Sequence, residues 1–155
     1  MVAHPLEGED ADHDGAPQGR DQAEDEPDHR GELAAMFALI TFHIDHQADV
    51  TMATVSVPVE EAPRYGIVGV DESYKVTSFV EKPKNPPTNL ANMGVYVFNL
   101  NVLDQALWTD RHQHDSAHDF GKNILPRLVA DGRRVFAYPY SGYWVDVGTI
   151  ESYWQ

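Results

Sequence analysis

The chain has 155 residues and a formal net charge of −14, and this charge is unevenly distributed. Residues 1–32 hold eleven acidic and two basic residues, a balance of −9, so the other residues together carry only −5. This acidity excludes a general attraction to nucleic acid or anionic lipid, and no apolar run approaches the roughly 18–20 residues that span a membrane. The sequence has no cysteine and no apolar signal segment at its start, which predicts a cytoplasmic protein without disulfides.

Residues 1–31 consist mostly of Asp, Glu, His, Gly, Pro and Gln, with Val2 and Leu6 as the only large aliphatic residues. A segment of this composition cannot bury enough apolar surface to offset the entropy lost on ordering, so we expect an acidic, disordered leader. It could serve as an acidic interaction tail, or it could be a solvated leader or sequence foreign to the fold. The folded domain is therefore expected at residues 32–155.

Residues 32–48 predict a helix, because their large apolar residues recur at helical spacing. These residues are Leu33, Met36, Phe37, Ile40 and Ile44. Residues 50–57 place Val and Met at alternate positions, which predicts a strand that Pro58 ends. Two more strands, at 65–71 and 75–81, flank a predicted hairpin loop, and the proline-rich residues 83–87 form the next loop.

The second half of the chain continues this mixture of helices and strands. The predicted strands are residues 93–98, 134–138 and 143–147, and the predicted helices are residues 102–108, 120–129 and 150–155. Asp119 can cap the second of these helices, in which Pro126 indicates a kink or an early break. The absence of an internal repeat and the mixed order predict an α/β fold with a mixed sheet. Because the last helix is cut short at Gln155, we expect a partial domain.

The sequence contains no P-loop, GxGxxG, GxSxG or HExxH motif. Three histidines, His112, His114 and His118, lie close together. Their spacing matches no strong metal-ligand pattern, so a polar loop is predicted there rather than a metal site.

Two short sequences carry candidate chemistry. Lys82 ends a strand before Pro83 and presents a cation suited to a phosphate oxygen, while Glu81 could accept hydrogen bonds from sugar hydroxyls. The alternative for this pair is a solvated ion pair. Asp146 follows a short apolar strand and precedes a glycine, a position at which α/β sheets hold ligands and metal ions. It could bind Mg²⁺ or simply cap the following helix.

Six sequence blocks in order give the chain a resemblance to a known family. From about Phe37 to Gln155 it resembles the second half of the catalytic domain of the glucose-1-phosphate adenylyltransferases (ADP-glucose pyrophosphorylases), which are sugar-phosphate nucleotidyltransferases. The blocks are ADVTMATVSVP (48–58), RYGIVGVDE (64–72), FVEKPKNPP (79–87), ANMGVYVFN (91–99), SAHDFGKNILP (116–126) and YWVDVGTIESYW (143–154). EKP and DVGT are shared by many sugar nucleotidyltransferases, whereas HDFGKNILP and the last block resemble the adenylyl-glucose branch. The resemblance implies an incomplete Rossmann-like fold with α/β/α layers.

The resemblance also implies a role for each matching residue on the sugar side. Lys82 would contact the phosphate of glucose 1-phosphate, and Glu81 would bind glucose hydroxyls. Gly66 would let the backbone approach the sugar. Asn92 stands where the adenylyl-glucose branch usually has a serine near the sugar phosphate. An amide can still donate and accept hydrogen bonds there, but the substitution puts this contact in doubt.

A metal ion and a reaction are implied as well. Asp146 would be a catalytic carboxylate that binds Mg²⁺, the expected cofactor, and Trp144 would shape the site beside it. The family reaction converts ATP and α-D-glucose 1-phosphate into ADP-glucose and pyrophosphate for glycogen or starch synthesis. The sugar-phosphate oxygen attacks the α-phosphorus of ATP in line, and catalysis consists largely of positioning and charge neutralisation.

Residues 1–36 resemble nothing in the family's N-terminal half, which binds ATP and carries another metal-binding aspartate. The family's C-terminal β-helix domain also has no counterpart after Gln155. We therefore expect residues 32–155 to be a partial catalytic domain that is inactive by itself. Its expected partners are glucose 1-phosphate and, through the missing half, ATP, with no nucleic acid and no membrane. The family forms homo-oligomers, specifically tetramers.

Two other functions stay open at this point. The chain could belong to a nucleotidyltransferase that uses another nucleotide, such as dTTP or UTP, because the missing half selects the base. It could also be a non-catalytic sugar-phosphate-binding or regulatory subunit that pairs with a full-length enzyme.

Overall fold

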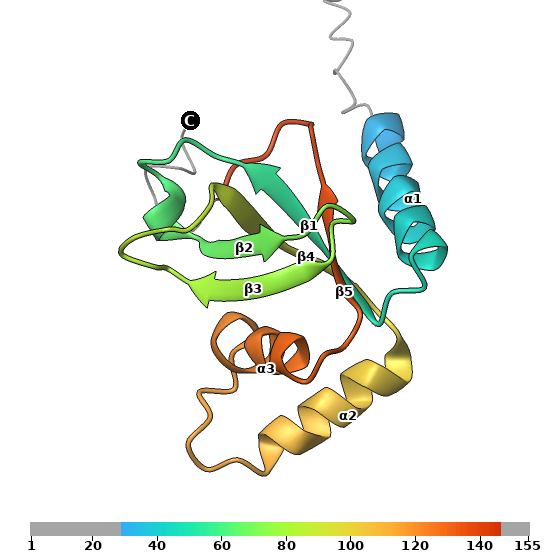
Figure 1. Ribbon diagram of the computed structural model, residues 1–155. Helices are drawn as coiled ribbons and strands as arrows, with labels where there is room; N and C mark the ends of the chain where they lie inside the picture. Colours follow the sequence, from blue (N-terminus) through green and yellow to red (C-terminus); the bar gives the residue numbers. More distant parts are fainter. Residues whose placement is uncertain (1–28, 147–155) are drawn as a thin grey trace, which may run out of the picture.

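The central element of the fold is one mixed sheet of five strands, seen in a computed structural model that describes residues 29–146 (Figure 1). The strands are β1 (Val50–Ser56), β2 (Gly66–Val70), β3 (Val76–Glu81), β4 (Leu90–Phe98) and β5 (Val135–Pro139). Their order across the sheet is β3-β2-β4-β1-β5. Strand β1 runs parallel to β5 and antiparallel to β4, and β2 runs antiparallel to both β3 and β4. The mixed α/β sheet predicted from the sequence is therefore confirmed.

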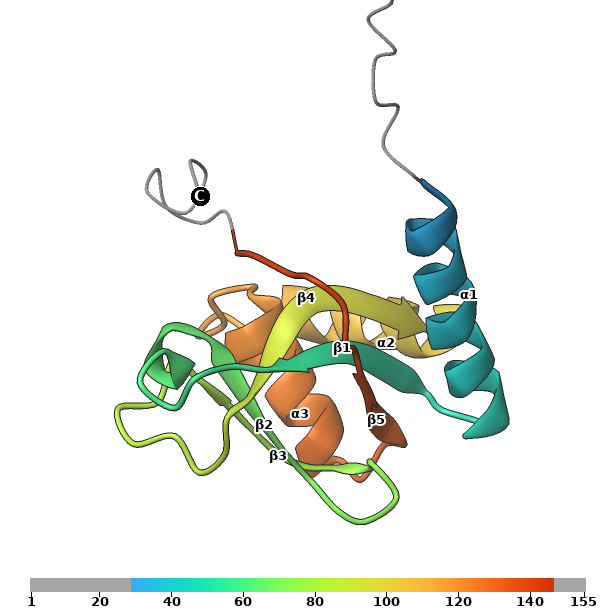
Figure 2. The ribbon, with the colours of Figure 1, turned by 90° about the horizontal axis from the view of Figure 1, so that it is seen from above.

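Helices cover both faces of this sheet. They are α1 (His29–Asp45), α2 (Leu100–Arg111) and α3 (Leu125–Ala130), with a 3₁₀ turn η1 (Ala62–Arg64) and a π-helical turn η2 (Phe120–Ile124). On β1, Met52 points into the core against α3, whereas the next residue, Ala53, lines a groove against α1. Because successive strand side chains face opposite ways, α1 lies on the other face from α3 (Figures 1 and 2). None of the described helices is long and apolar enough to cross a membrane.

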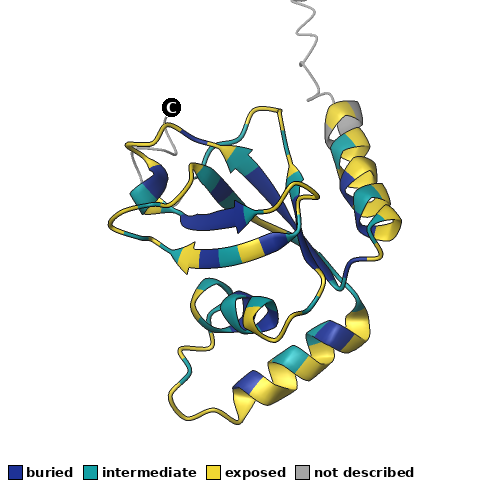
Figure 3. Cartoon of the chain, viewed as in Figure 1, coloured by how far each residue is buried: buried dark blue, intermediate teal, exposed yellow. Residues whose placement is uncertain are grey.

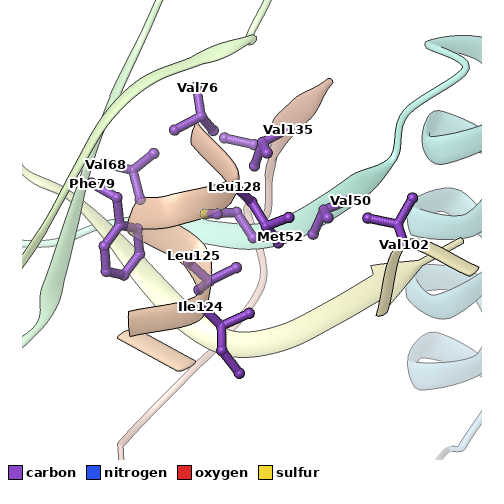
Figure 4. Close-up of a cluster of buried hydrophobic side chains, with 11 residues drawn as sticks. Val50, Met52, Val68, Val76, Phe79, Val102, Ile124, Leu125, Leu128 and Val135 are labelled. Carbon is purple, nitrogen blue, oxygen red and sulfur yellow. The ribbon is translucent and has the colours of Figure 1, made fainter. Parts of the chain in front are cut away.

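The main hydrophobic core lies between the sheet and the pair α2 and α3 (Figure 4). Its buried residues are Val50, Met52, Val68, Val76, Phe79, Val102, Ile124, Leu125, Leu128, Val135 and Ala137. Figure 3 shows that burial is concentrated in the strands and in the side of α3 that faces them. A smaller buried cluster beside η1 comprises Val57, Ala62, Ile67 and Ala91. This second cluster supports the loops that carry the candidate site.

Helix α1 is present as predicted, but it packs through a different side. The five periodic residues that predicted it are all exposed, Phe37 to 68%. Leu39 and His43 are buried instead, and His43 Nδ1 lies 2.9 Å from Thr51 Oγ1 of β1. The helix carries apolar residues on most of its circumference, so their spacing identified a helix but not its buried side. The helix also begins at His29, before the predicted boundary at residue 32, and the rest of the predicted leader lies outside the described residues.

The C-terminal elements differ more from the prediction. The helix predicted at 120–129 is divided into η2 and α3, with Pro126 in the first turn of α3, where proline is tolerated. The strand predicted at 143–147 is wrong for residues 143–146, which are irregular. The chain leaves the sheet after Tyr140, whose N–H still donates to the Thr54 carbonyl, and residues 141–146 pair with no strand in the described part of the chain. The helix predicted at 150–155 lies outside the described residues.

Candidate functional site

The structure brings all six candidate residues from the sequence to one pocket of about 220 Å³. They are Gly66, Glu81, Lys82, Asn92, Trp144 and Asp146. The pocket lies where β2 begins and β3 ends, and β4 and the segment after β5 complete its wall. Four further residues line it, namely Arg64, Tyr65, Met93 and Gly94. The residues come from distant parts of the chain, so their meeting defines a candidate site. Their chemical roles stay predictions.

Gly66 and Glu81 face each other across the β2–β3 pair. A Cβ atom on Gly66 would lie 2.7 Å from Cζ of Phe79 and 2.9 Å from Oε2 of Glu81, closer than real Cβ atoms approach. The glutamate side chain is only 23% exposed because it lies over the β2 backbone. Glycine is therefore needed at position 66 to make room for Glu81 and Phe79.

Lys82 has a strained backbone. Its φ angle is +46°, in the left-handed region that non-glycine residues rarely adopt. Its side chain is 65% exposed, and its Nζ lies 3.8 Å from Glu81 Oε1, a contact that contributes little when so exposed. Strain of this kind persists only where the surroundings enforce it, and it is concentrated at functional sites. Gln47, Tyr74 and His118 also have left-handed φ angles, so the conformation alone assigns Lys82 no role, and its contact with an anion stays a prediction.

Asn92 lies next to an irregularity in β4. The pairing of β1 with β4 shifts between Met52 and Thr54, and Gly94 adopts a φ of +77° there. The Asn92 side chain accepts a hydrogen bond from the Gly94 N–H at 3.2 Å, and its Nδ2 donates to the Tyr96 hydroxyl at 2.7 Å. Asn92 therefore fixes both the irregular backbone and a tyrosine beside the pocket. A serine side chain is too short to span the same two groups.

Tyr96 is a residue of this region that sequence reasoning missed. Burial raises the pKa of its phenol, the carboxylates of Glu81 and Asp119 raise it further, and the Asn92 hydrogen bond opposes them. Its ring is stacked on Phe120 with centroids 5.8 Å apart. The available signal was its position four residues after Asn92 in an otherwise apolar strand. That signal does not show that Tyr96 lies near two carboxylates.

Asp146 lies between two neighbouring pockets. Together with Arg64, Tyr65 and Trp144 it also lines a second pocket, of about 310 Å³. The rings of Tyr65 and Trp144 meet edge to face with centroids 5.5 Å apart, and the Arg64 guanidinium carbon lies 5.7 Å from the Tyr65 centroid. Asp146 was predicted at the end of a strand. The structure places it instead in an irregular segment beside aromatic rings.

Metal-binding groups can be assessed over residues 29–146. No cluster of three His, Asp or Glu side chains is arranged there to hold an ion. His112 and His118 make separate contacts, with the Trp108 carbonyl and the Asp110 carboxylate respectively. The carboxylate of Asp146 in the pocket fits a Mg²⁺ ion of the kind that one or two carboxylates, water and substrate phosphates hold together.

The block SAHDFGKNILP folds around the buried carboxylate of Asp110 on α2, which is 3% exposed. The Ser116 hydroxyl donates to it at 2.7 Å, and His118 Nδ1 lies 2.8 Å from its other oxygen. These hydrogen bonds, that of Ser116 foremost, hold the pKa of the Asp110 carboxyl below its usual range. The loop ends at Asp119, whose carboxylate caps η2 by accepting the Lys122 N–H at 2.8 Å. This arrangement places η2 beside β3 and Glu81.

Comparison with known proteins identifies the class to which this fold and pocket belong. Residues 28–155 match the nucleotidyl transferase family, and the chain belongs to that family. Among its relatives are glucose-1-phosphate adenylyltransferases from Acetivibrio thermocellus (50% identical), Geobacillus stearothermophilus (47%) and Bacillus licheniformis (47%), each over 117 residues. These alignments cover 76% of this chain but only 28%, 30% and 31% of the respective relatives. The chain therefore spans less than a third of the length of these relatives, and the resemblance noted in its sequence is confirmed.

Proposed function

We propose that the chain from α1 onward is a partial nucleotidyltransferase catalytic domain that forms the glucose 1-phosphate side of a glucose-1-phosphate adenylyltransferase. The observation that carries this proposal is the meeting of Glu81, Lys82 and Asp146 in one pocket. The similarity to enzymes of that name, at 47–50% identity, supports the choice of substrate. The complete reaction would join ATP and α-D-glucose 1-phosphate to give ADP-glucose and pyrophosphate in glycogen synthesis.

The pocket provides groups for both parts of a sugar phosphate. Lys82 supplies an exposed cation for the phosphate, and Arg64 lines the same pocket as a second cation. Glu81 supplies acceptors for sugar hydroxyls, and its carboxylate lies close against Gly66 of β2. A ligand with a neutral polar end and an anionic end therefore matches the site better than an anion alone.

The metal belongs to this proposal as well. Asp146 would hold Mg²⁺, which when bound neutralises charge on the transferring phosphates. Trp144 and Tyr65 line the same pocket as that carboxylate, and their rings meet edge to face. The residues of this chain thus hold and orient the sugar phosphate, so that its oxygen faces the incoming nucleotide.

In the transfer, a phosphate oxygen of glucose 1-phosphate forms a bond to the α-phosphorus of ATP. The bond from that phosphorus to the oxygen bridging to the β-phosphorus breaks, and pyrophosphate leaves with the electron pair. The sequence offers no glycine-rich loop for the triphosphate. We therefore propose that the chain binds glucose 1-phosphate in the cytoplasm but needs a nucleotide-binding part to turn it over. Assembly into the family's tetramer belongs to the same proposal.

A non-catalytic sugar-phosphate-binding subunit is the second candidate. It is supported by a pocket that holds Glu81, Lys82 and Asp146 in a sequence that has no glycine-rich loop for a triphosphate.

Calorimetry on the 155-residue chain tests the proposal. With Mg²⁺ present, glucose 1-phosphate should bind more tightly than glucose 6-phosphate or orthophosphate, and Asp146→Asn should remove the Mg²⁺ dependence. Equal affinity for all three ligands, or none for glucose 1-phosphate, would contradict it. A pyrophosphate-release assay with ATP should show no turnover, and turnover at ordinary enzyme rates would overturn the partial-domain assignment.

A further inference from the structure

The carboxylate of Glu81 is enclosed between two glycines from different parts of the fold. A Cβ atom on Gly121, in η2, would lie 2.7 Å from Glu81 Oε2 and 3.2 Å from its Cδ. A Cβ atom on Gly66, in β2, would lie 2.9 Å from the same Oε2. Any side chain at position 121 would therefore require the carboxylate to move.

The backbone conformation does not explain the glycine at position 121. Gly94 and Gly132 have φ angles of +77° and +72°, where glycine is favoured for conformational reasons. Gly121 does not share this left-handed conformation. What distinguishes it is the nearby carboxylate, with the Asp119 side chain as the next neighbour at 3.4 Å. Glycine at position 121 therefore provides space for the carboxylate and is not required there for an unusual backbone conformation.

The turn that carries Gly121 is held firmly beside Glu81. Asp119 caps η2 through the Lys122 N–H, and its carbonyl accepts the Asn123 N–H at 2.9 Å. Phe120 is stacked on Tyr96 of β4. The preceding loop is anchored by Ser116 on the buried Asp110. Because the turn is fixed on both sides, a clash at position 121 would displace Glu81 rather than η2.

We propose that Gly121 is a positioning residue for sugar recognition, because its missing side chain leaves the slot that holds the Glu81 carboxylate in the wall of the pocket. This inference rests on the proposed function, in that the group positioned is the acceptor for sugar hydroxyls. The phosphate contacts come from Lys82 and Arg64, which lie outside the slot. Lys82 Nζ lies 3.8 Å from Glu81 Oε1, so a displaced carboxylate also changes the surroundings of the cation. Gly121 should therefore influence binding of the sugar part more than binding of the phosphate part.

The test compares Gly121→Ala with Gly31→Ala, a control whose new Cβ would meet nothing within 4 Å. Calorimetry should show that Gly121→Ala weakens glucose 1-phosphate about tenfold or more, the effect of losing a hydrogen bond to a charged group. Orthophosphate binding should change much less than glucose 1-phosphate binding, and Gly31→Ala should change neither affinity. Equal losses for both ligands would overturn the proposal.

A second readout needs no ligand. The ¹³C signal of the Glu81 side-chain carboxyl, assigned by its loss in Glu81→Ala, should shift in Gly121→Ala and not in Gly31→Ala. An unshifted signal would overturn the inference. A shifted signal in a protein that does not bind glucose 1-phosphate would support the positioning role and reject the proposed function. If Gly121→Ala fails to fold, the double variant with Glu81→Ala decides: recovered folding supports the proposal, and continued failure overturns it.

Discussion

The backbone N–H of Lys82 donates a hydrogen bond to the carbonyl oxygen of Tyr65 over 3.0 Å. This bond extends the β2–β3 pairing one residue beyond Gly66 and Glu81, at the point where Lys82 takes its left-handed conformation. The lysine is thus held by its main chain, while its side chain stays exposed at the pocket. The direction of the cation depends on the strand ends and not on a partner side chain.

Because the main chain and the side chain of Lys82 have different roles, substitutions at position 82 should affect ligand binding and protein stability separately. Lys82→Ala and Lys82→Gly should both weaken glucose 1-phosphate binding by roughly 1.5–3 kcal/mol, since each removes a charge-assisted contact. Lys82→Gly should be more stable than Lys82→Ala by about 1 kcal/mol, because only glycine adopts a φ of +46° without strain. Calorimetry and denaturant unfolding measure the two effects. Equal stability of the two variants would show that the backbone is not strained.

The Asn92 amide should control the acidity of Tyr96. Its hydrogen bond to the phenol oxygen favours the charged phenolate, so Asn92→Ala should raise the Tyr96 pKa further above its usual value. ¹³C NMR titration of the tyrosine ring carbons measures this change. Asn89→Ala is the control, because the Asn89 amide donates to the Val57 carbonyl instead. A lower Tyr96 pKa in Asn92→Ala would contradict the assigned hydrogen bond.

Asp110 should make the stability of the fold sensitive to acid. Its folded pKa is lowered, chiefly by Ser116 and then by His118, so its stabilising effect is present above the usual carboxyl value of 3.8. That effect is lost as the pH falls through the lower folded pKa. Asp110→Asn should therefore be less stable near pH 7 and lose less stability on acidification than the unsubstituted protein.

Unfolding by urea between pH 3 and pH 7 measures this dependence. Asp104→Asn, which changes an exposed acid on the same helix, serves as the control. Parallel pH profiles for Asp110→Asn and the unsubstituted protein would exclude Asp110 as the source of the acid sensitivity.

Two leucines test where the core lies. Leu125 is fully buried in α3, so Leu125→Ala should lower the free energy of unfolding by about 2–5 kcal/mol. Leu33 is exposed on α1, and Leu33→Ala should change the free energy of unfolding by no more than about 0.5 kcal/mol. Thermal or denaturant unfolding compares them directly. A large loss from Leu33→Ala would mean that the outer side of α1 is covered in solution.

The strands could be predicted from sequence where local chemistry was sufficient. The loop between β2 and β3 is an example, because the Asp71 carboxylate accepts hydrogen bonds from Ser73 and Lys75 N–H groups and closes the turn by itself. Residues 143–146 show the limit of this approach. Their short apolar run fits a strand, but a strand also requires a neighbour, and the run contains no information about one.

The candidate site could likewise be predicted only in part, where its residues stand together in short sequence motifs. Lys82 and Glu81 stand side by side in a short motif, and Asp146 stands in another, so the resemblance located them directly. Tyr96 and Gly121 were missed because their importance depends on distance to the Glu81 carboxylate. That distance is set by the irregular pairing of β4 and by the capped turn η2, neither of which is encoded beside Glu81 in the chain.

The parallel pairing of β1 with β5 also determines when the sheet can form. Val50 pairs with Val135, and Asp49 beside it accepts hydrogen bonds from Arg134, a separation of 85 residues. During synthesis β1 emerges long before this partner, and it keeps one open edge until β5 arrives. Such distant pairing slows folding, and an open strand edge attracts other chains in the meantime. The arrival of β5, the last strand among the described residues, therefore sets the earliest point at which this sheet can be completed.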